Sequence, residues 1–544
     1  MASATSKVLE LVGAFLLGGG VVAVGYELIT RGDDPSAPAS DAEASPESVA
    51  SADGSHKPAS IYAGGAGDDG ESDPESPAAG DESSPDAPSA AGPVPPHRLP
   101  NEDGTYTQYP PVFEDIPPMD DEAKKEYPRH GLVTSLAAIV RERADLESPI
   151  LGILRSGTRV RVDEERTFGG GCSEGWNKIY PKGWMCRKAG LKVDDSPPND
   201  GIISVPSPKV DQPLPYEYWR VKDEMTPFFH RLPSFGEQDG ADTAGSDWYA
   251  KHKREPMPTD RSARPDDVPA VVKEYMNSGY YVTKAGEEMK SERRFLRTTL
   301  GSYARKYQLK PKESPVFQGQ LLPGGAEDLP MYFIRREIPF KKREGELSDV
   351  LLDTEDFPER LGTHPFVRSV QMGPKAYYED EEGRLMRTYA VGKAFKIKRP
   401  PGVKATEHWV HIDLSEQTLV AYEGDVPVFA TLVSTGKEPG MTPIGVHRVQ
   451  IKHIATPMRD QPEESEAYSI DDVPWTQYFA GSIALHGAFW HAGFGQVRSH
   501  GCVNLSPADA RWVFGFTEPH VPQGWHAIAP LARGEKGSAV VVTE

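Results

Sequence analysis

Residues 481–516 read GSIALHGAFWHAGFGQVRSHGCVNLSPADARWVFGF, and this stretch predicts a strand, a glycine-rich loop and a helix in succession. The apolar residues 483–485 are typical of a buried strand that ends at His486. Ser506 is a favoured helix N-cap, Pro507 suits the first helical position, and Asp509 favours the positive end of the helix dipole. Residues 498–504 therefore link a strand-rich core to the start of a helix, where a side chain on rigid elements can face a cleft.

Cys502 in this link has neighbours that suit a nucleophile. It is one of only three cysteines, so it is left over if the other two pair. A free cysteine has a pKa of about 8.5 and needs a base or positive surroundings to react as a thiolate. His486 lies sixteen residues upstream, His500 lies two residues upstream, and Gly501 allows the backbone to approach closely. A thiol, an imidazole and paired backbone donors are the groups that acyl transfer requires.

The sequence before this stretch is rich in strand signals from His408 onward. Residues 408–414, 418–423, 426–434 and 442–453 alternate in polarity or run with β-branched and aromatic residues, which is typical of β-strands. Residues 456–473 are acidic and include Tyr468, and we expect them to form a lid or an ordinary loop. The C-terminal part of the chain is therefore expected to be β-rich with one short helix.

Two segments resemble the L,D-transpeptidase (YkuD-type) catalytic domain family. The segment HGAFWHAGFGQVRSHGCVNLS is similar to the family's active-site signature, a histidine followed after about fifteen residues by Ser-His-Gly-Cys-hydrophobic-Asn/Arg. The segment TGKEPGMTPIGVHRV resembles the family's Thr-Gly … Thr-Pro-x-Gly strand. The resemblance runs over residues 405–544 and implies a β-sandwich-like domain of mixed strands with a short helix.

The resemblance also implies a role for each residue of the signature. Cys502 would attack the carbonyl after the L-centre of diaminopimelate in a donor tetrapeptide stem and release D-alanine. His486 would take the thiol proton, with its ring oriented by the backbone carbonyl of Gly487. Backbone N–H groups near Gly501 would stabilise the oxyanion, and His500 would line the pocket. An amine would then resolve the thioester and give a 3→3 cross-link or an attachment to a protein.

Four further residues are predicted to contact the substrate. Ser499 and Asn504 fall on the signature, whereas Trp490 and Tyr468 are placed near the substrate groove by position alone. A zinc site was the competing interpretation of this region, with His486, His491, His500 and Cys502 as ligands. That spacing is not a common structural zinc pattern, and no second cysteine joins it. We therefore expect no metal and no cofactor.

The N-terminal part of the chain has the composition of an anchor and a tether. Residues 11–26 form one apolar run without charge, which indicates a signal-anchor helix within residues 1–32 or, as the second interpretation, a cleaved signal peptide. Residues 33–90 hold fourteen acidic residues against one lysine. Such a stretch cannot bury enough apolar surface to offset its chain entropy, so residues 33–130 are predicted to be a disordered acidic tether rich in proline, serine and alanine. A solubilising tail without a target is the alternative.

Residues 131–197 show short strand-like pieces separated by Gly and Pro, which favours a small barrel. GILRSGTRVRV and GWNKIYPKGWMC resemble bacterial Src-homology-3-like domains that accompany cell-wall enzymes. Cys172 and Cys186 both lie in this region, and in an exported protein we expect them to pair as a disulfide, with two buried thiols as the alternative.

Residues 213–400 are predicted to be an uncharacterised β-rich region. RRFLRTTLGSYARKYQLK and RLMRTYAVGKAFKIK share an Arg-x-x-Arg-Thr pattern, which suggests a diverged repeat of small barrels. The sequence indicates no function for this region beyond wall binding or spacing.

The sequence thus predicts a multidomain, mostly β protein in which small β-barrels precede a C-terminal L,D-transpeptidase-type β-sandwich with a short helix. Its net charge of −21 excludes a global basic field for nucleic acid. The predicted partners are peptidoglycan stem peptides and the cytoplasmic membrane, and the predicted location is the cell envelope or periplasm. The alternatives are an L,D-carboxypeptidase or amidase on the same scaffold, in which water resolves the thioester, and a non-catalytic wall-binding protein.

Overall fold

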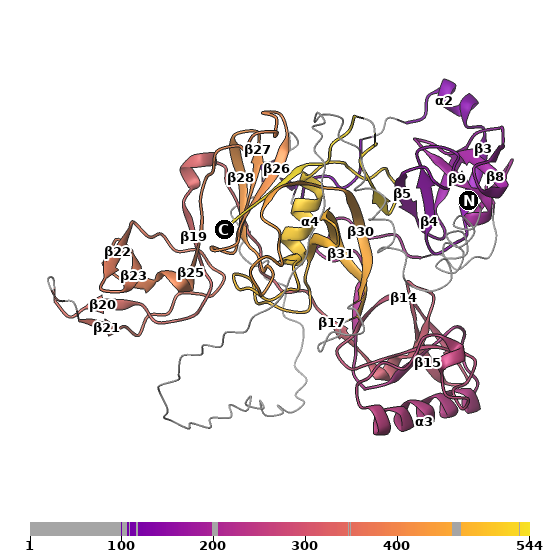
Figure 1. Cartoon of the computed structure of the whole chain (residues 1–544), viewed down its shortest axis with the longest axis horizontal. Helices are drawn as coiled ribbons and strands as arrows, with labels where there is room; N and C mark the ends of the chain where they lie inside the picture. The colour runs from indigo at the N-terminus through magenta and orange to yellow at the C-terminus, as the bar shows by residue number, and fades with distance from the viewer. Residues whose placement is uncertain are drawn as a thin grey trace, which may run out of the picture. The chain divides into compact units, whose positions relative to one another are not determined.

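The computed structural model describes residues 99–544 except 101–105, 108, 116–117, 199–204, 346–347, 349, 460–468 and 533 (Figure 1). The chain divides into two compact units, Met1–Pro96 and His97–Glu544, and all described residues belong to the second. The expected anchor and most of the expected tether lie outside the described residues. Within the described ranges, no helix is long and apolar enough to cross a membrane.

The first described module is built from short strands. Its elements are β1 (Leu99–Pro100), β2 (Tyr106–Thr107), α2 (Asp121–Glu126), β3 (Arg129–Val133), β4 (Ala138–Arg141), β5 (Ile150–Leu154), β6 (Arg159–Val162), β7 (Thr167–Gly169), β8 (Cys172–Lys178), β9 (Trp184–Cys186), the 3₁₀ turn η2 (Arg187–Ala189) and β10 (Leu191–Asp194). β3 lies between β6 and β10, while β4 pairs with β5 and β9. The other edge of β5 is occupied by β34 of the C-terminal module, so these strands form open sheets.

The second module is a seven-stranded sheet with one long helix. Its elements are β11 (Glu217–Val221), β12 (Thr226–Phe229), α3 (Phe235–His252), η3 (Arg261–Ala263), β13 (Val272–Met276), β14 (Tyr281–Lys290), β15 (Arg293–Thr298), β16 (Tyr303–Arg305), η4 (Lys306–Gln308) and β17 (Leu309–Lys312). α3 begins at a capping box, in which the Ser234 hydroxyl accepts from the Glu237 N–H and the Glu237 carboxylate accepts from the Ser234 N–H. The strands run in the order β17-β11-β14-β15-β16-β12-β13.

The third module comes after β18 in the sequence, and β18 itself pairs with a strand of the C-terminal module. The elements are β18 (Gln320–Leu321), η5 (Gly325–Asp328), β19 (Met331–Ile334), β20 (Lys341–Arg343), β21 (Leu351–Asp353), β22 (Arg368–Met372), β23 (Lys375–Glu379), β24 (Leu385–Arg387), η6 (Thr388–Ala390) and β25 (Val391–Ala394). β18 pairs with β28, whereas β20–β24 form a sheet of their own beside the β19–β25 pair. An apolar core that includes Phe333 and Leu432 shows how this module packs on the next.

The C-terminal module consists of two sheets around a buried helix. Its elements are β26 (His408–Asp413), β27 (Thr418–Glu423), β28 (Val426–Leu432), β29 (Gly445–Arg448), β30 (Ile451–Arg459), β31 (Ser469–Ala480), β32 (Ile483–Gly487), β33 (Val503–Leu505), α4 (Pro507–Phe516), β34 (Ala527–Ile528) and β35 (Ala539–Thr543). One sheet has the order β18-β28-β27-β26-β35-β29, and the other contains β30-β31-β32-β33. The mostly β fold class is confirmed, but the described residues form no closed barrel, because edge strands such as β5 and β18 pair with the C-terminal module instead.

α4 starts as the sequence predicts, with Ser506 as N-cap, Pro507 in the first turn and the Asp509 N–H donating to the Ser506 hydroxyl (3.1 Å). The helix, yellow in Figure 1, packs against β31 and β32. A Cβ atom on Gly487 would lie 3.3 Å from both the Ala510 Cβ and the Pro507 Cα. Gly487 therefore lets the helix approach β32 closely, and because neighbouring residues on a strand face opposite sides, His486 points away from the helix.

Candidate active site

The register of β32 and β33 brings the predicted catalytic pair together. The two strands are parallel neighbours, and His486 lies opposite Asn504. Continuing the register by two residues places Cys502 opposite Ala484. Since alternate residues of a strand share a face, the side chains of Cys502, His486 and Asn504 lie on the same face. Cys502 and His486 are therefore diagonal neighbours on this face.

Cys502 is the free thiol of the described chain and is partly exposed. Its Sγ lies 3.8 Å from the Ser482 carbonyl oxygen, to which it donates. Burial by the surrounding protein raises the pKa of the thiol to about 11, and the backbone of Ala484 opposes this effect. At neutral pH the sulfur therefore carries its proton, and a base is needed to generate the nucleophile.

His486 is 3% exposed and is the base that the face provides. Burial lowers its pKa to about 4, whereas the backbone of Gly487 raises it. The imidazole is therefore neutral at pH 7 and can accept a proton. Its Nδ1 makes no hydrogen bond of ordinary geometry among the described residues. The Gly487 backbone therefore acts on the ring through its effect on the pKa, and the predicted hydrogen bond to the Gly487 carbonyl is not formed. The Trp490 ring stacks on His486 with centroids 5.7 Å apart.

The loop that carries Cys502 is fixed by its own hydrogen bonds. The Gly501 N–H donates to the Ser499 hydroxyl (3.1 Å), and this hydroxyl donates to the Cys502 carbonyl oxygen (2.6 Å). The Gly501 carbonyl accepts from the Thr442 hydroxyl (2.7 Å). Ser499 is thus a loop-closing residue, and the Gly501 N–H is already engaged. His500 is exposed on the same loop.

Gly501 occupies a backbone position that only glycine fits. Its φ is +129°, which side chains of L-residues rarely allow. A Cβ atom there would lie 2.6 Å from Ile483 Cδ1 and 2.7 Å from the Met441 carbonyl oxygen. The absence of a side chain therefore sets the path of the chain immediately before the nucleophile.

Asn504 contacts a histidine that the sequence did not assign to the site. Its side-chain amide lies 3.0 Å from His491 Nε2, and His491 Nδ1 accepts from the Gly493 N–H (3.1 Å). A neutral ring that accepts at Nδ1 carries its proton at Nε2, so we orient the Asn504 amide with its oxygen toward His491. Burial and the charge of Arg498 lower the pKa of His491 to about 4, which keeps the ring neutral. His491 therefore holds the signature asparagine.

Tyr478 is a second residue that sequence reasoning missed. It lies on β31 and pairs with Ala484 of the neighbouring strand β32. On the other edge of β32, Ala484 lies opposite Cys502. Burial raises the pKa of Tyr478, and the charge of Cys502 adds to this effect. Of the remaining predicted contacts, Trp490 borders His486, whereas Tyr468 lies outside the described residues.

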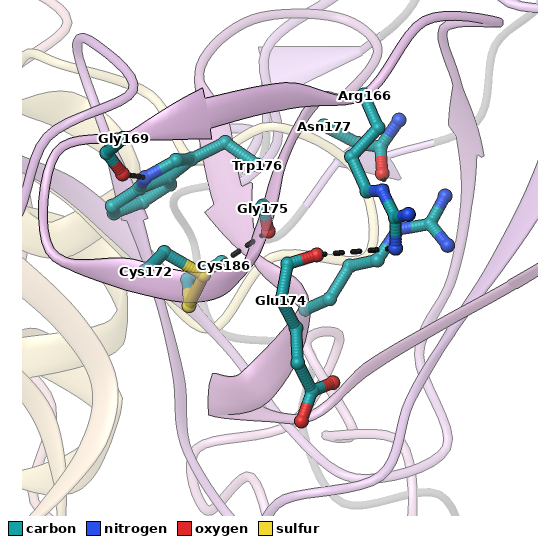
Figure 2. The surroundings of a disulfide bond; sticks show 9 residues. Arg166, Gly169, Cys172, Glu174, Gly175, Trp176, Asn177 and Cys186 are labelled. Carbon is teal, nitrogen blue, oxygen red and sulfur yellow. Dashed lines mark hydrogen bonds between the residues drawn. A yellow bond between two sulfur atoms is a disulfide. The ribbon is translucent and has the colours of Figure 1, made fainter.

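Cys172 and Cys186 form a disulfide that joins β8 and β9 in the first module (Figure 2). The Cys172 sulfur lies 3.0 Å from the Gly175 carbonyl oxygen, and Trp176 packs beside the cystine while its indole N–H donates to the Gly169 carbonyl (3.0 Å). In the described parts of the chain, no three His, Cys, Asp or Glu side chains gather in a way that could hold a metal ion.

The comparison with known families agrees with this geometry. Residues 407–542 match the L,D-transpeptidase (YkuD) catalytic domain. This match covers the sheets, the loop and the helix that position Cys502 and His486, and does not extend into the three preceding modules. No curated protein matches the chain.

Several solved L,D-transpeptidase structures are similar to part of the chain. One from Stackebrandtia nassauensis is 23% identical, with 26% of this chain and 58% of that chain covered and a TM-score of 0.19. One from Xylanimonas cellulosilytica is 24% identical, with 27% and 64% covered and a TM-score of 0.19. One from Mycobacterium smegmatis is 14% identical, with 43% and 89% covered and a TM-score of 0.21. This chain spans less than two thirds of the first two structures.

Proposed function

We propose that the L,D-transpeptidase-like module transfers an acyl group from a peptidoglycan tetrapeptide stem to an amine. The observation that carries the proposal is the placement of a free thiol and a neutral buried imidazole on one face of two parallel strands, within a segment that matches the family. The pair supplies a nucleophile and a base, which are the minimum that acyl transfer by a thioester requires.

The first half-reaction forms the acyl-enzyme. Cys502 passes its proton to His486 as the sulfur attacks the carbonyl after the L-centre of diaminopimelate, forming a C–S bond and a tetrahedral oxyanion. Collapse of this intermediate breaks the C–N bond to the terminal D-alanine. The His486 imidazolium gives the proton to the departing amine, so free D-alanine and a thioester remain.

The second half-reaction resolves the thioester. An acceptor amine attacks the same carbonyl, gives a proton to His486 and forms an amide bond, and the C–S bond breaks to return the Cys502 thiol. With the amine of another stem the product is a 3→3 cross-link, and with an amine of a protein it is an attachment. With water the product is a shortened stem, which is the carboxypeptidase or amidase alternative.

Mass spectrometry of muropeptides incubated with the full chain tests the proposal. We expect new 3→3 dimers and free D-alanine with the wild type, and neither with Cys502→Ala or His486→Ala. His252→Ala, at the exposed end of α3, is the matched histidine control and retains activity. Shortened stems without dimers would replace the transferase by the hydrolase, and products that persist in Cys502→Ala would refute thioester chemistry altogether.

We further propose that the module acts in the cell envelope, anchored to the cytoplasmic membrane through residues 1–32. The uncharged apolar run 11–26 supports an anchor, and the acidic residues 33–90 support an extended reach from it. Cell fractionation tests this: the full chain is expected in the membrane fraction and a chain without residues 1–32 in the soluble fraction. Equal distribution of both would contradict the anchor.

A further inference from the structure

Three modules of the chain repeat one structural unit, a strand, a 3₁₀ turn and a second strand. The units are β9-η2-β10, β16-η4-β17 and β24-η6-β25. The residue before each turn has nearly the same backbone, with φ and ψ of −76° and 127° at Cys186, −64° and 124° at Arg305, and −59° and 131° at Arg387. None of these residues caps the turn with its side chain. Their side chains therefore have other partners: Cys186 forms the disulfide, and the Arg305 guanidinium donates to the Gln238 side chain (2.8 Å).

In the second module this position carries an arginine held between two aromatic rings. Arg305 lies opposite Phe295 on the neighbouring strand. Its guanidinium lies 5.5 Å from the Phe295 ring centroid and 4.9 Å from that of Tyr307, the central residue of the 3₁₀ turn. Both distances fall within the range of cation–π attraction.

The third module builds the same stack from different residues. Arg387 lies opposite Tyr377, as Arg305 lies opposite Phe295. Its guanidinium lies 5.3 Å from the Tyr377 centroid and 5.2 Å from that of Tyr389, the central residue of its turn. Arg336 approaches the Tyr389 ring as well, at 5.5 Å. We call Arg305 with Tyr307, and Arg387 with Tyr389, the two Arg–Tyr platforms.

The first module does not contain this stack of an arginine and two aromatic rings. Trp176 lies opposite Cys186, so the aromatic ring is kept while the arginine is replaced by half of the disulfide (Figure 2). The central residue of the turn is Lys188, in place of a tyrosine. The unit therefore folds without an Arg–Tyr platform, which shows that the fold does not require one.

The outer ring of each platform is exposed although it is aromatic. Tyr307 is 55% exposed and Tyr389 is 47% exposed, while the flanking residues Gln308 and Ala390 are buried. An exposed ring at the same position in two modules contributes little to either core. Both exposed rings are therefore open to a ligand.

Both platforms lie in segments of positive charge. Residues 292–312 contain seven basic residues and one acidic residue, and residues 384–399 contain six basic residues and no acidic one, so each has a net charge of +6 in a chain of −21. Some of these charges are paired, for example Arg384 with Asp380 and Lys306 with Glu287. The remaining excess favours an anionic ligand.

We propose that the two Arg–Tyr platforms are equivalent subsites for a peptidoglycan strand, which rests on the proposed function of the catalytic module. The apolar face of a sugar ring can stack on the exposed tyrosine, and the guanidinium behind it can pair with a carboxylate of the strand. A polymer that repeats these two features fits two identical subsites on separate modules. Binding at one platform raises the effective concentration of the polymer at the other, so the pair holds the strand more tightly than either alone.

Binding of the full chain to purified peptidoglycan tests this proposal. We expect Tyr307→Ala and Tyr389→Ala each to weaken the apparent affinity at least tenfold, and the double variant to weaken it by about a hundredfold or more, since linked subsites gain about 10²–10⁴ from each other. Lys188→Ala, at the corresponding place in the first module, is the matched control and leaves binding unchanged. Unchanged binding in the double variant would overturn the proposal, and so would full displacement by dextran sulfate, which would show unspecific attraction of charge.

A second readout separates this proposal from that of the active site. The double tyrosine variant should still cross-link small soluble stems at the wild-type rate, because the platforms are not part of the catalytic face. Cys502→Ala should bind the polymer normally and cross-link nothing. Loss of polymer binding in Cys502→Ala would place the binding at the active site and refute the platforms, whereas cross-linking by Cys502→Ala would refute only the proposed catalysis.

Discussion

Replacing Gly501 by alanine should shift the position of Cys502 without changing the chemical groups of the proposed active site. The residue has φ +129°, and an added Cβ would meet the Met441 carbonyl oxygen at 2.7 Å and Ile483 Cδ1 at 2.6 Å. The Ile483 methyl group is the end of a flexible side chain and can move, but the Met441 carbonyl belongs to the backbone. The chain at residue 501 must therefore shift, and Cys502 shifts with it.

The magnitude follows from two contributions. Holding an alanine in a backbone region that favours glycine costs about 1–3 kcal/mol, and the overlap with fixed atoms adds about 1–3 kcal/mol. Gly440 provides the matched control, because its φ is +84° and an added Cβ would meet nothing within 4 Å. Gly440→Ala should therefore lower the free energy of unfolding only through the unfavourable backbone conformation of the alanine. A displacement of about 1 Å at a reacting group lowers the rate of reaction about a hundredfold.

Two measurements on both variants test this reasoning. Thermal unfolding should show Gly501→Ala to be less stable than Gly440→Ala, and acylation of Cys502 by a thioester-forming probe should be about a hundredfold slower in Gly501→Ala but near wild type in Gly440→Ala. Comparable acylation in the two variants would refute the argument, because it would show that the contact with Met441 does not fix the position of the sulfur.

Three further predictions concern groups whose pKa is shifted. Alkylation of Cys502 by iodoacetamide should accelerate about tenfold per pH unit from pH 7 to 10, because the pKa of the thiol is raised to about 11; a plateau below pH 9 would contradict it. The phenol of Tyr478 should ionise only well above pH 10, because burial and the charge of Cys502 raise its pKa; a difference titration against Tyr478→Phe that shows this tyrosine ionising at pH 10 or below would contradict it. Lys452 is fully buried, its Nζ donates to the Phe514 and Thr517 carbonyls, and burial lowers its pKa to about 7. Because the unfolded chain then binds a proton that the folded chain does not, the free energy of unfolding should rise by about 1.4 kcal/mol per pH unit from pH 7 to 10 relative to Lys452→Met; parallel pH profiles of the two proteins would disprove it.

Local signals in the sequence were sufficient for parts of the C-terminal module. The N-cap of α4 could be predicted from Ser506, Pro507 and Asp509, because a cap depends on residues within one turn. Likewise, the strand ending at His486 follows from a short apolar run. The pairing of that strand with β33, which follows Cys502, was not predicted and is seen only in the structure.

Contacts that depend on long-range register could not be predicted in this way. Tyr478 faces the site only because β31 pairs with β32, and His491 reaches Asn504 only because the intervening loop folds back. Nothing in the spacing of these residues distinguishes them from other histidines and tyrosines. Periodicity defines which face of an element a residue occupies, but not which distant element covers that face.

The repeat predicted from the sequence and the strand–turn–strand repeat of the structure rest on different residues. The shared Arg-x-x-Arg-Thr pattern matches Arg297 with Arg387, whereas the structure matches Arg305 with Arg387. Arg297 lies within β15, a strand earlier than the turn. The match in the sequence rests on identical residue types. The two modules of the structure instead share an arginine near two aromatic rings, and the ring on the neighbouring strand is Phe in one module and Tyr in the other.

The pKa values of Cys502 and His486 bear on when the proposed catalytic pair would become reactive. The pKa of the thiol is raised to about 11 and that of His486 is lowered to about 4, so proton transfer between them is unfavourable in the free protein. Once a carbonyl carbon accepts the sulfur's electrons, the charge moves to an oxyanion and the imidazolium gains a partner, so the transfer becomes favourable only along the reaction path. A sulfur that stays protonated until an acyl donor is bound reacts slowly with oxidants, which attack the thiolate. The same burial that makes Cys502 a poor free nucleophile would therefore protect it from oxidants if the protein acts in the proposed cell envelope, where the Cys172–Cys186 disulfide would also persist.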